Sequence, residues 1–203
     1  MSDAVLFPGV VLPLHIFEPC YRDMVSDALA SHKSWVVVKT GAQPAGGQAP
    51  PMCDVGCIAK IIHAEPLPEG RFNVLVQGID RFRLVQEVAG AWRYRCVSGE
   101  IIERPDAPEV QAARAELMRL HSCVYTLANA AAQRDQQLVE VLHSTDDPVA
   151  LADILAAVLV KNPAEQQVLL ATTDLRARLR QLLDKLAEVL LRYDRPASSS
   201  RRN

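Results

Sequence analysis

The sequence lacks the features that define several large classes of protein. Its 203 residues contain no run approaching the roughly 20 apolar residues that a membrane-spanning helix needs. The first residues have neither the basic region nor the apolar core of a secretion signal. The 22 Lys and Arg against 24 Asp and Glu give none of the basic excess of a dedicated non-specific nucleic-acid binder. We therefore expect a globular cytoplasmic protein without a membrane partner.

Motifs of catalysis are also missing. The sequence contains no G-x-x-x-x-G-K-S/T phosphate loop, no G-x-S-x-G elbow and no H-E-x-x-H. None of the five scattered histidines has a neighbouring nucleophile or a spaced acid that the sequence supports as a catalytic pair, and Cys57 with His63 is a remaining alternative for a nucleophile and base. These absences predict a protein that is not an enzyme, with no catalytic residues and no cofactor.

Cysteine is scarce and irregularly placed. The five cysteines are an odd number in a chain without a secretion signal, which favours reduced, mostly buried thiols. Cys53 and Cys57 have the spacing C-x-x-x-C with no second pair of ligands, and four residues on a strand span roughly 13 Å, too far for one ion. We expect no metal site.

Glycine is absent from the second half of the chain. All nine glycines lie between Gly9 and Gly99, and eight of the ten aromatics lie between Phe7 and Tyr94. The half with glycines and aromatics has a composition typical of strands joined by turns. The half without glycine has a composition typical of helices. The predicted class is α+β, with a β domain over residues 1–104, a helical bundle over 105–195 and a disordered tail over 196–203.

Short apolar and β-branched runs predict the strands. Gly56 lies within one of them and indicates a bulge or a close backbone approach. Pro19 at a first helical turn, followed by Tyr21, Met24 and Val25, predicts one helix among the strands. The predicted strands are Val10–Leu14, Ser34–Val38, Val55–His63, Phe72–Gly78, Arg81–Val88, Trp92–Val97 and Glu100–Ile102.

The second half predicts helices with recognisable starts. One continuous apolar seam from Val110 to Leu127 indicates a long helix that opens at Ala107-Pro108, and a shorter helix is expected near Gln136–His143. Asp147-Pro148, Asn162-Pro163 and Thr173-Asp174 are helix-capping sequences, each opening a further helix. The seam of the last helix, from Leu175 to Tyr193, favours packing within the chain over a coiled-coil dimer.

Basic residues gather in one segment. Residues 71–95 hold five arginines against two acids, with Trp92 and Tyr94 interleaved. Arginines and aromatics on a strand face bind single-stranded RNA through phosphate contacts and stacking. The alternative is the solvated outer face of a sheet, with Phe82 and Leu84 inward. The candidate RNA-binding residues are Arg81, Arg83, Arg93, Tyr94 and Arg95.

Several segments, in order, resemble the N-terminal domain of Lon proteases. The resemblance implies a small pseudo-barrel related to PUA domains, followed by a helical bundle. Two departures are visible: only Met1–Val5 precede the first motif, where the family usually has a further strand, and Cys20 stands where arginine is common. The matching segments are Leu6–Pro19 (LFPGVVLPLHIFEP), Asp54–Ile61 (DVGCIAKI), Gly78–Leu84 (GIDRFRL), Asp147–Asp153 (DPVALAD) and Leu169–Leu179 (LLATTDLRARL).

The resemblance also implies a function. In Lon this region recognises substrates and helps to assemble the oligomer, and the ATPase and peptidase follow it. We expect a stand-alone, non-catalytic module, monomeric or weakly self-associating, that binds unfolded or partner polypeptides at an apolar groove. RNA binding through the arginine strands is the alternative. The candidate polypeptide-binding residues are Leu14, His15, Phe17, Glu18, Tyr21 and Arg22.

Overall fold

The structure is a computed structural model that describes residues 4–44, 46–131, 136–142 and 144–193. The predicted tail over 196–203 and the helix end at His143 lie outside these residues. The described chain divides into two compact units. The first holds residues 1–104 and 162–171, and the second holds residues 105–161 and 172–203. We call them the β-rich unit and the helical unit and describe each by itself.

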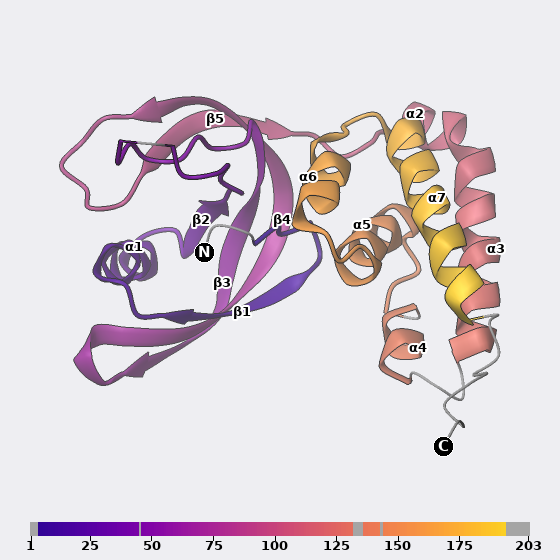
Figure 1. Ribbon diagram of the computed structural model, residues 1–203, viewed down its shortest axis with the longest axis horizontal. Coiled ribbons are helices and arrows are strands. Elements are labelled where there is room, and N and C mark those ends of the chain that lie inside the picture. Colours follow the sequence, from indigo (N-terminus) through magenta and orange to yellow (C-terminus); the bar gives the residue numbers. More distant parts are fainter. Residues whose placement is uncertain (1–3, 45, 132–135, 143, 194–203) are drawn as a thin grey trace, which may run out of the picture. The chain divides into compact units, whose positions relative to one another are not determined.

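The β-rich unit is an antiparallel sheet with one inserted helix, α1 (Pro19–Ala30), as predicted (Figure 1). The sheet has the order β1-β4-β3-β2, and β5 pairs with the second half of β4. Among the described residues no further strand pairs with the two ends of this order, so β1 and β2 are edge strands. The strands are β1 (Val11–Ile16), β2 (Ser34–Val37), β3 (Val55–Leu67), β4 (Arg71–Val88) and β5 (Cys96–Ile102).

Several predicted strand boundaries are wrong, since β1 and β3 run beyond their predicted ends and the strands predicted at 92–97 and 100–102 form the single strand β5. The separate strands predicted at 72–78 and 81–88 are one 18-residue strand, β4, which continues through Gly78. A Cβ at Gly78 would collide with the backbone carbonyl of Phe7, so this glycine serves a close approach rather than a turn. The strand predicted at 92–97 begins only at Cys96, because residues 89–95 form a loop before β5.

Gly56 confirms the close approach that the sequence predicted. A Cβ at this position would lie 2.5 Å from the carbonyl oxygen of Val37 on the neighbouring strand β2. A register shift between Cys57 and Ala59 follows directly after it on β3. Such irregularities increase the local twist of a sheet. The core that the sheet encloses consists of Leu6, Ile16, Val25, Ala28, Cys57, Ala59, Ile61, Val74 and Val76.

A helix from the second half of the sequence belongs to the β-rich unit. The prediction assigned all of residues 105–195 to the helical bundle, but α6 (Pro163–Ala171) clusters with the sheet. Two hydrogen bonds hold it there. The buried Arg81 Nε donates to the Leu170 carbonyl at 3.0 Å, and Gln167 Nε2 donates to the Val55 carbonyl at 2.8 Å.

The helical unit begins at a complete capping box. The Asp106 carboxylate accepts from the Glu109 N–H, and the Glu109 carboxylate accepts from the Asp106 N–H. Asp147 and Asp174 cap later helices through their side chains, as their sequences predicted. The helices are α2 (Ala107–Ala112), α3 (Arg114–Ala131), α4 (Gln136–Leu142), α5 (Pro148–Leu159) and α7 (Leu175–Tyr193).

The predicted long helix is interrupted at Ala113. Its backbone leaves the helical conformation there and divides the helix into α2 and α3. The seam survives the break, since Leu117, Leu120, Val124 and Leu127 are all buried. α3 packs beside α7, so the predicted packing of the α7 seam within the chain is confirmed (Figure 1). The predicted α+β class is confirmed as well.

Candidate functional site

An apolar pocket of about 280 Å³ opens in the β-rich unit between the edge strands β1 and β2. β1 contributes Leu12 and Leu14, α1 contributes Tyr21 and Met24, and the segment from Trp35 to Thr40 provides the wall on the β2 side. All of these side chains are only partly buried. The volume is near the lower end of the range for ligand pockets, about 300–1,000 Å³.

Local structure explains why these side chains meet. Alternation along β1 exposes Val11, Pro13 and His15 and turns Leu12 and Leu14 toward the core. On α1, helical spacing buries Val25 and Ala28 and leaves Tyr21 and Met24 at the edge of the core. The pocket is therefore an accessible margin of the apolar core.

Arg95 forms the charged end of the pocket. Its Nε and Nη2 donate to the two carboxylate oxygens of Glu87, each at 2.7 Å, and its Nη1 donates to the Pro50 carbonyl at 2.7 Å. The hydrogen bond from Arg95 lowers the pKa of the Glu87 carboxyl. The guanidinium is thus held in a fixed position beside a carboxylate that neutralises its charge.

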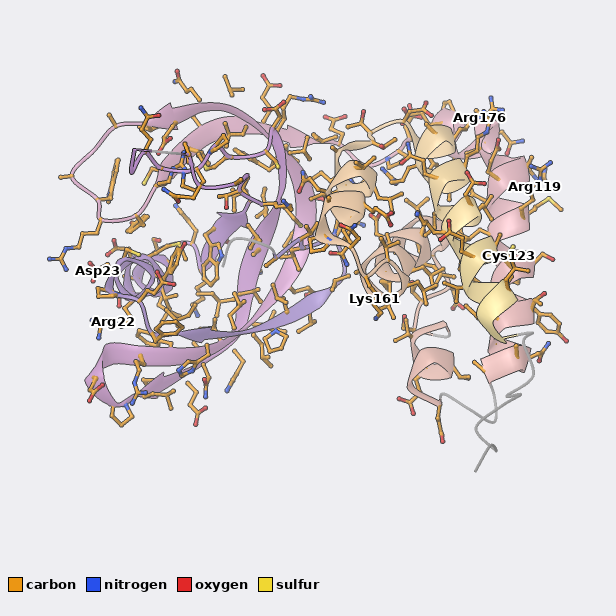
Figure 2. The ribbon with its side chains drawn as sticks, viewed as in Figure 1. Arg22, Asp23, Arg119, Cys123, Lys161 and Arg176 are labelled. Atoms are coloured by element: carbon orange, nitrogen blue, oxygen red, sulfur yellow. The ribbon has the colours of Figure 1, made fainter. Side chains whose placement is uncertain are left out.

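The loop that carries Arg95 is fastened to α1. Tyr94 Oη donates to Asp27 Oδ2 at 2.8 Å, and Arg93 lies 3.7 Å from the carboxylate of Asp23. Burial, reinforced by the hydrogen bond to Asp27, raises the pKa of Tyr94 to about 12. Figure 2 shows Asp23 on the left of α1. We call residues 89–95 the 89–95 loop.

The structure separates the predicted polypeptide-binding residues. Leu14 and Tyr21 line the pocket, and burial raises the pKa of Tyr21. His15 lies instead on the exposed face of β1, where its Nδ1 is 2.8 Å from Asn73 Oδ1 and its ring stacks on Phe17. Phe17 is 60% exposed. Neither His15 nor Phe17 borders the pocket.

Glu18 and Arg22 have local structural roles. Glu18 precedes α1, and its carbonyl accepts from the Arg22 N–H. The Arg22 guanidinium, labelled in Figure 2, donates to the carbonyl of Glu69 in the turn between β3 and β4. Glu18 and Arg22 do not line the pocket.

The predicted RNA-binding residues do not form one strand face. Arg81 is 7% exposed and bonded to α6, whereas Arg83 is exposed on the same strand. Arg93, Tyr94 and Arg95 lie on the 89–95 loop rather than on a strand, and each contacts a carboxylate. Arg81 and Arg95 are therefore already hydrogen-bonded to carboxylate or carbonyl oxygens, and Arg93 forms an exposed ion pair.

The sequence did not predict the β2 side of the pocket. The sequence predicts a strand that contains Trp35, Val36 and Val37 and a loop that contains Pro50, but neither pattern indicates that β2 is an edge strand. Edge position depends on the pairing of strands that lie far apart in sequence. The β-branched run followed by a Gly- and Pro-rich loop was the one available signal.

Leu14 and His15 also line a second pocket, together with His63, Glu65 and Asn73. All five cysteines are free thiols, but only Cys57 is buried and the other four are partly exposed, so the prediction of mostly buried thiols is wrong. In the part of the chain that the structure describes, no three His, Cys, Asp or Glu residues gather where they could hold a metal ion. Among the described helices, none combines the length and the apolar character needed to cross a membrane.

Comparison with known proteins identifies the family. A family model described as the ATP-dependent protease La (LON) substrate-binding domain matches residues 1–188. The chain belongs to this family. Lon proteases of Phenylobacterium zucineum and Roseiflexus castenholzii are 30% and 31% identical over 92% of this chain. The chain spans about a quarter of the length of these curated relatives, 24% and 23%.

Solved structures agree with the fold of the Lon N-terminal domain. The N-terminal domain of a Mycobacterium avium complex Lon protease superposes with a TM-score of 0.70 at 21% identity, covering 93% of this chain and 95% of that one. A Lon N-terminal domain protein from Xanthomonas campestris gives 0.56 at 22% identity, covering 90% and 93%. The resemblance and the fold predicted from the motifs are both confirmed. The family matched is the substrate-binding domain of Lon and not its protease or ATPase part.

Proposed function

We propose that this chain is a non-catalytic module that binds segments of unfolded polypeptide in the pocket between β1, β2 and α1. The observation that carries the proposal is an accessible apolar pocket, at the margin of the core, in a member of a substrate-binding domain family. Unfolded chains expose apolar side chains that folded proteins bury, and a pocket lined by Leu14, Met24 and Trp35 favours such side chains.

The placement of the arginines favours polypeptide over RNA as the ligand. A phosphate-binding face needs guanidinium groups that are free to meet phosphate oxygens. Arg81, Arg93 and Arg95 already contact a carbonyl or a carboxylate. Weak self-association and a cytoplasmic location remain predictions from the sequence.

Binding of a fluorescent, permanently unfolded polypeptide tests the proposal. We expect saturable binding in fluorescence anisotropy that persists from low to physiological salt, because apolar contacts are not screened by ions. A labelled single-stranded RNA is titrated in parallel. Salt-sensitive RNA binding without polypeptide binding would refute the proposal.

Two matched variants locate the binding site. Val38→Glu places a carboxylate in the pocket, and Val85→Glu makes the same change at an exposed valine of β4 outside it. We expect Val38→Glu to weaken polypeptide binding at least tenfold, because a buried charge opposes an apolar ligand. Val85→Glu should bind as the unmodified protein does. Equal affinities of the two variants would place the binding site elsewhere.

A further inference from the structure

The pocket meets its two edge strands in different ways. Each edge strand of a sheet has a row of backbone N–H and C=O groups without a neighbouring strand. β1 borders the pocket with Leu12 and Leu14, which are two residues apart and so share one face of the strand. β2 and its continuation border it with four consecutive residues, Trp35–Val38. Consecutive side chains of a strand point to opposite faces, so a pocket on one face would meet only alternate residues. Because this pocket meets all four, it borders the edge of the strand.

Backbone hydrogen bonds show which groups of the β2 segment face the open edge. The Ile61 N–H donates to the Lys33 carbonyl at 2.7 Å, and the Cys53 N–H donates to the Lys39 carbonyl at 2.9 Å. Odd-numbered residues of this segment therefore face β3 and the residues before it. In an antiparallel pair, alternate residues direct their backbone groups to opposite sides. The N–H and C=O of Val36 and Val38 accordingly point toward the open edge, beside the pocket.

The open edge of β1 is interrupted. The Gly78 N–H donates to the Val10 carbonyl at 2.9 Å, so even-numbered residues of this segment face β4 and odd-numbered residues face away. The central outward-facing residue is Pro13, which has no N–H to donate. Proline at this position is a common protection of an edge strand against pairing. The β2 segment carries no proline between Ser34 and Thr40.

A ligand that satisfies this pocket needs two properties. Its backbone has to offer donors and acceptors to Val36 and Val38, and its side chains have to cover Leu12, Leu14 and Met24. An extended polypeptide has both, since its backbone pairs along one edge while alternate side chains point to one face. We propose that an extended segment of unfolded polypeptide adds to the sheet as a strand beside β2, with alternate apolar side chains in the pocket. This inference rests on the proposed function and specifies its mode of binding.

Backbone methylation of a peptide tests strand addition directly. The probe is a fluorescent peptide of alternating threonine and valine with terminal lysines, prepared unmodified, N-methylated at every valine, and N-methylated at every threonine. In an extended strand these two sets of amides point to opposite edges. We expect one methylated peptide to lose at least tenfold in affinity and the other to stay within threefold of the unmodified peptide. Equal affinities of the two methylated peptides, whether both bind or both fail, would overturn the proposal.

Variants of the protein provide the second measurement. Val38→Pro removes the outward-facing N–H, and Val38→Ala keeps it while trimming the side chain. We expect Val38→Pro to abolish the difference between the two methylated peptides and Val38→Ala to retain it, with circular dichroism checking that both variants fold. If the unmodified peptide and an unfolded protein both fail to bind, the proposed function fails as well. If binding depends on the pocket but not on methylation, only strand addition fails. A dimer that Val38→Pro dissociates would assign the edge to a second copy of the chain and also overturn the proposal.

Discussion

The β-rich unit and the helical unit place their charged pairs differently. In the β-rich unit, Arg93 and Arg95 meet their carboxylates at the surface and fix the 89–95 loop. In the helical unit, the side chains of Asp153 and Arg178 are 4% and 3% exposed and lie 3.6 Å apart. If one member of a buried pair is removed, the remaining charge stays buried with neither its partner nor hydration by water. If one member of an exposed pair is removed, water hydrates the remaining charge. The helical unit is therefore the more sensitive to loss of a single charge.

A second buried carboxylate extends this contrast. Glu116 is 5% exposed on α3, and its Oε1 lies 2.9 Å from Arg180 and 3.5 Å from Arg176, both on α7. Figure 2 labels Arg176 on this helix. The two ion-pair clusters join α7 to α5 and to α3. The buried ion pairs of the helical unit thus lie between packed helices, whereas the exposed ion pairs of Arg93 and Arg95 hold a loop.

The largest effect is expected from Asp153→Ala. The change leaves Arg178 buried without its carboxylate and should lower the free energy of unfolding by about 3–5 kcal/mol. Urea denaturation followed by circular dichroism measures it. Asp184→Ala, at an exposed site on α7, is the control. The double variant Asp153→Leu with Arg178→Met should recover most of the loss. A loss below about 1 kcal/mol in Asp153→Ala would contradict the contrast between the units.

A smaller loss is expected from Arg81→Met in the β-rich unit. The variant removes a charged hydrogen bond to the Leu170 carbonyl, a contact that typically contributes about 1.5–3 kcal/mol. Hydrogen exchange should show faster exchange of the α6 amides in particular. Arg83→Met, at the exposed arginine two residues further along β4, should leave these amides unchanged. Uniform acceleration over the whole chain would argue against a local role for Arg81.

Tyr94→Phe should cost about 1 kcal/mol, the typical contribution of one hydrogen bond. The pKa of Tyr94 is raised to about 12 in the folded protein, so folding favours the protonated phenol. This stabilisation is fully present below pH 10, the ordinary tyrosine pKa, and is lost as the pH rises toward 12. In an ultraviolet titration, Tyr94→Phe should remove the component near pH 12. Tyr125→Phe, at an exposed tyrosine, should leave that component in place.

The smallest effect is expected from Glu87→Gln, because exposed ion pairs typically contribute about 0.2–1 kcal/mol. The pH dependence distinguishes this pair. Because Arg95 lowers the pKa of Glu87 in the folded protein, the stabilisation is present above the ordinary glutamate pKa and is lost as the pH falls through the lower, folded value. The unfolding free energies of Glu87→Gln and the unmodified protein should differ at pH 7 and converge in acid. Glu100→Gln, at an exposed glutamate of β5, is the control for loss of one surface carboxylate.

Local signals in the sequence predicted the elements well. Pro19 marked the start of α1, and Asp147 and Asp174 marked the starts of α5 and α7, because capping depends on residues within one turn. The motifs from Leu6 to Leu179 predicted the family. Two of the twelve pocket residues followed from the same patterns, since Leu14 and Tyr21 occupy the inward positions of a strand and a helix.

Contacts between distant residues were not predictable in this way. Arg81 alternates with Phe82 and therefore resembled an exposed residue, but its partner is a carbonyl 89 residues away. The edge position of β2 depends on which strands pair, and the sequence of Trp35–Val38 is equally consistent with a central strand. His15 and Phe17 were grouped with Leu14 by sequence proximity, and strand alternation separates them.

The assignment of α6 to the β-rich unit affects how the chain folds as it is made. The helix α6, whose Leu170 carbonyl accepts from Arg81 and whose Gln167 donates to the Val55 carbonyl, is synthesised only after residues 105–161. At about 5–20 residues per second, the ribosome needs on the order of 3–11 s to produce that intervening segment. During this interval the guanidinium of Arg81 and the carbonyl of Val55 lack their α6 partners. The nascent β-rich unit is therefore complete only after α6 has been translated. A gene fragment ending at residue 104 encodes the sheet without this helix.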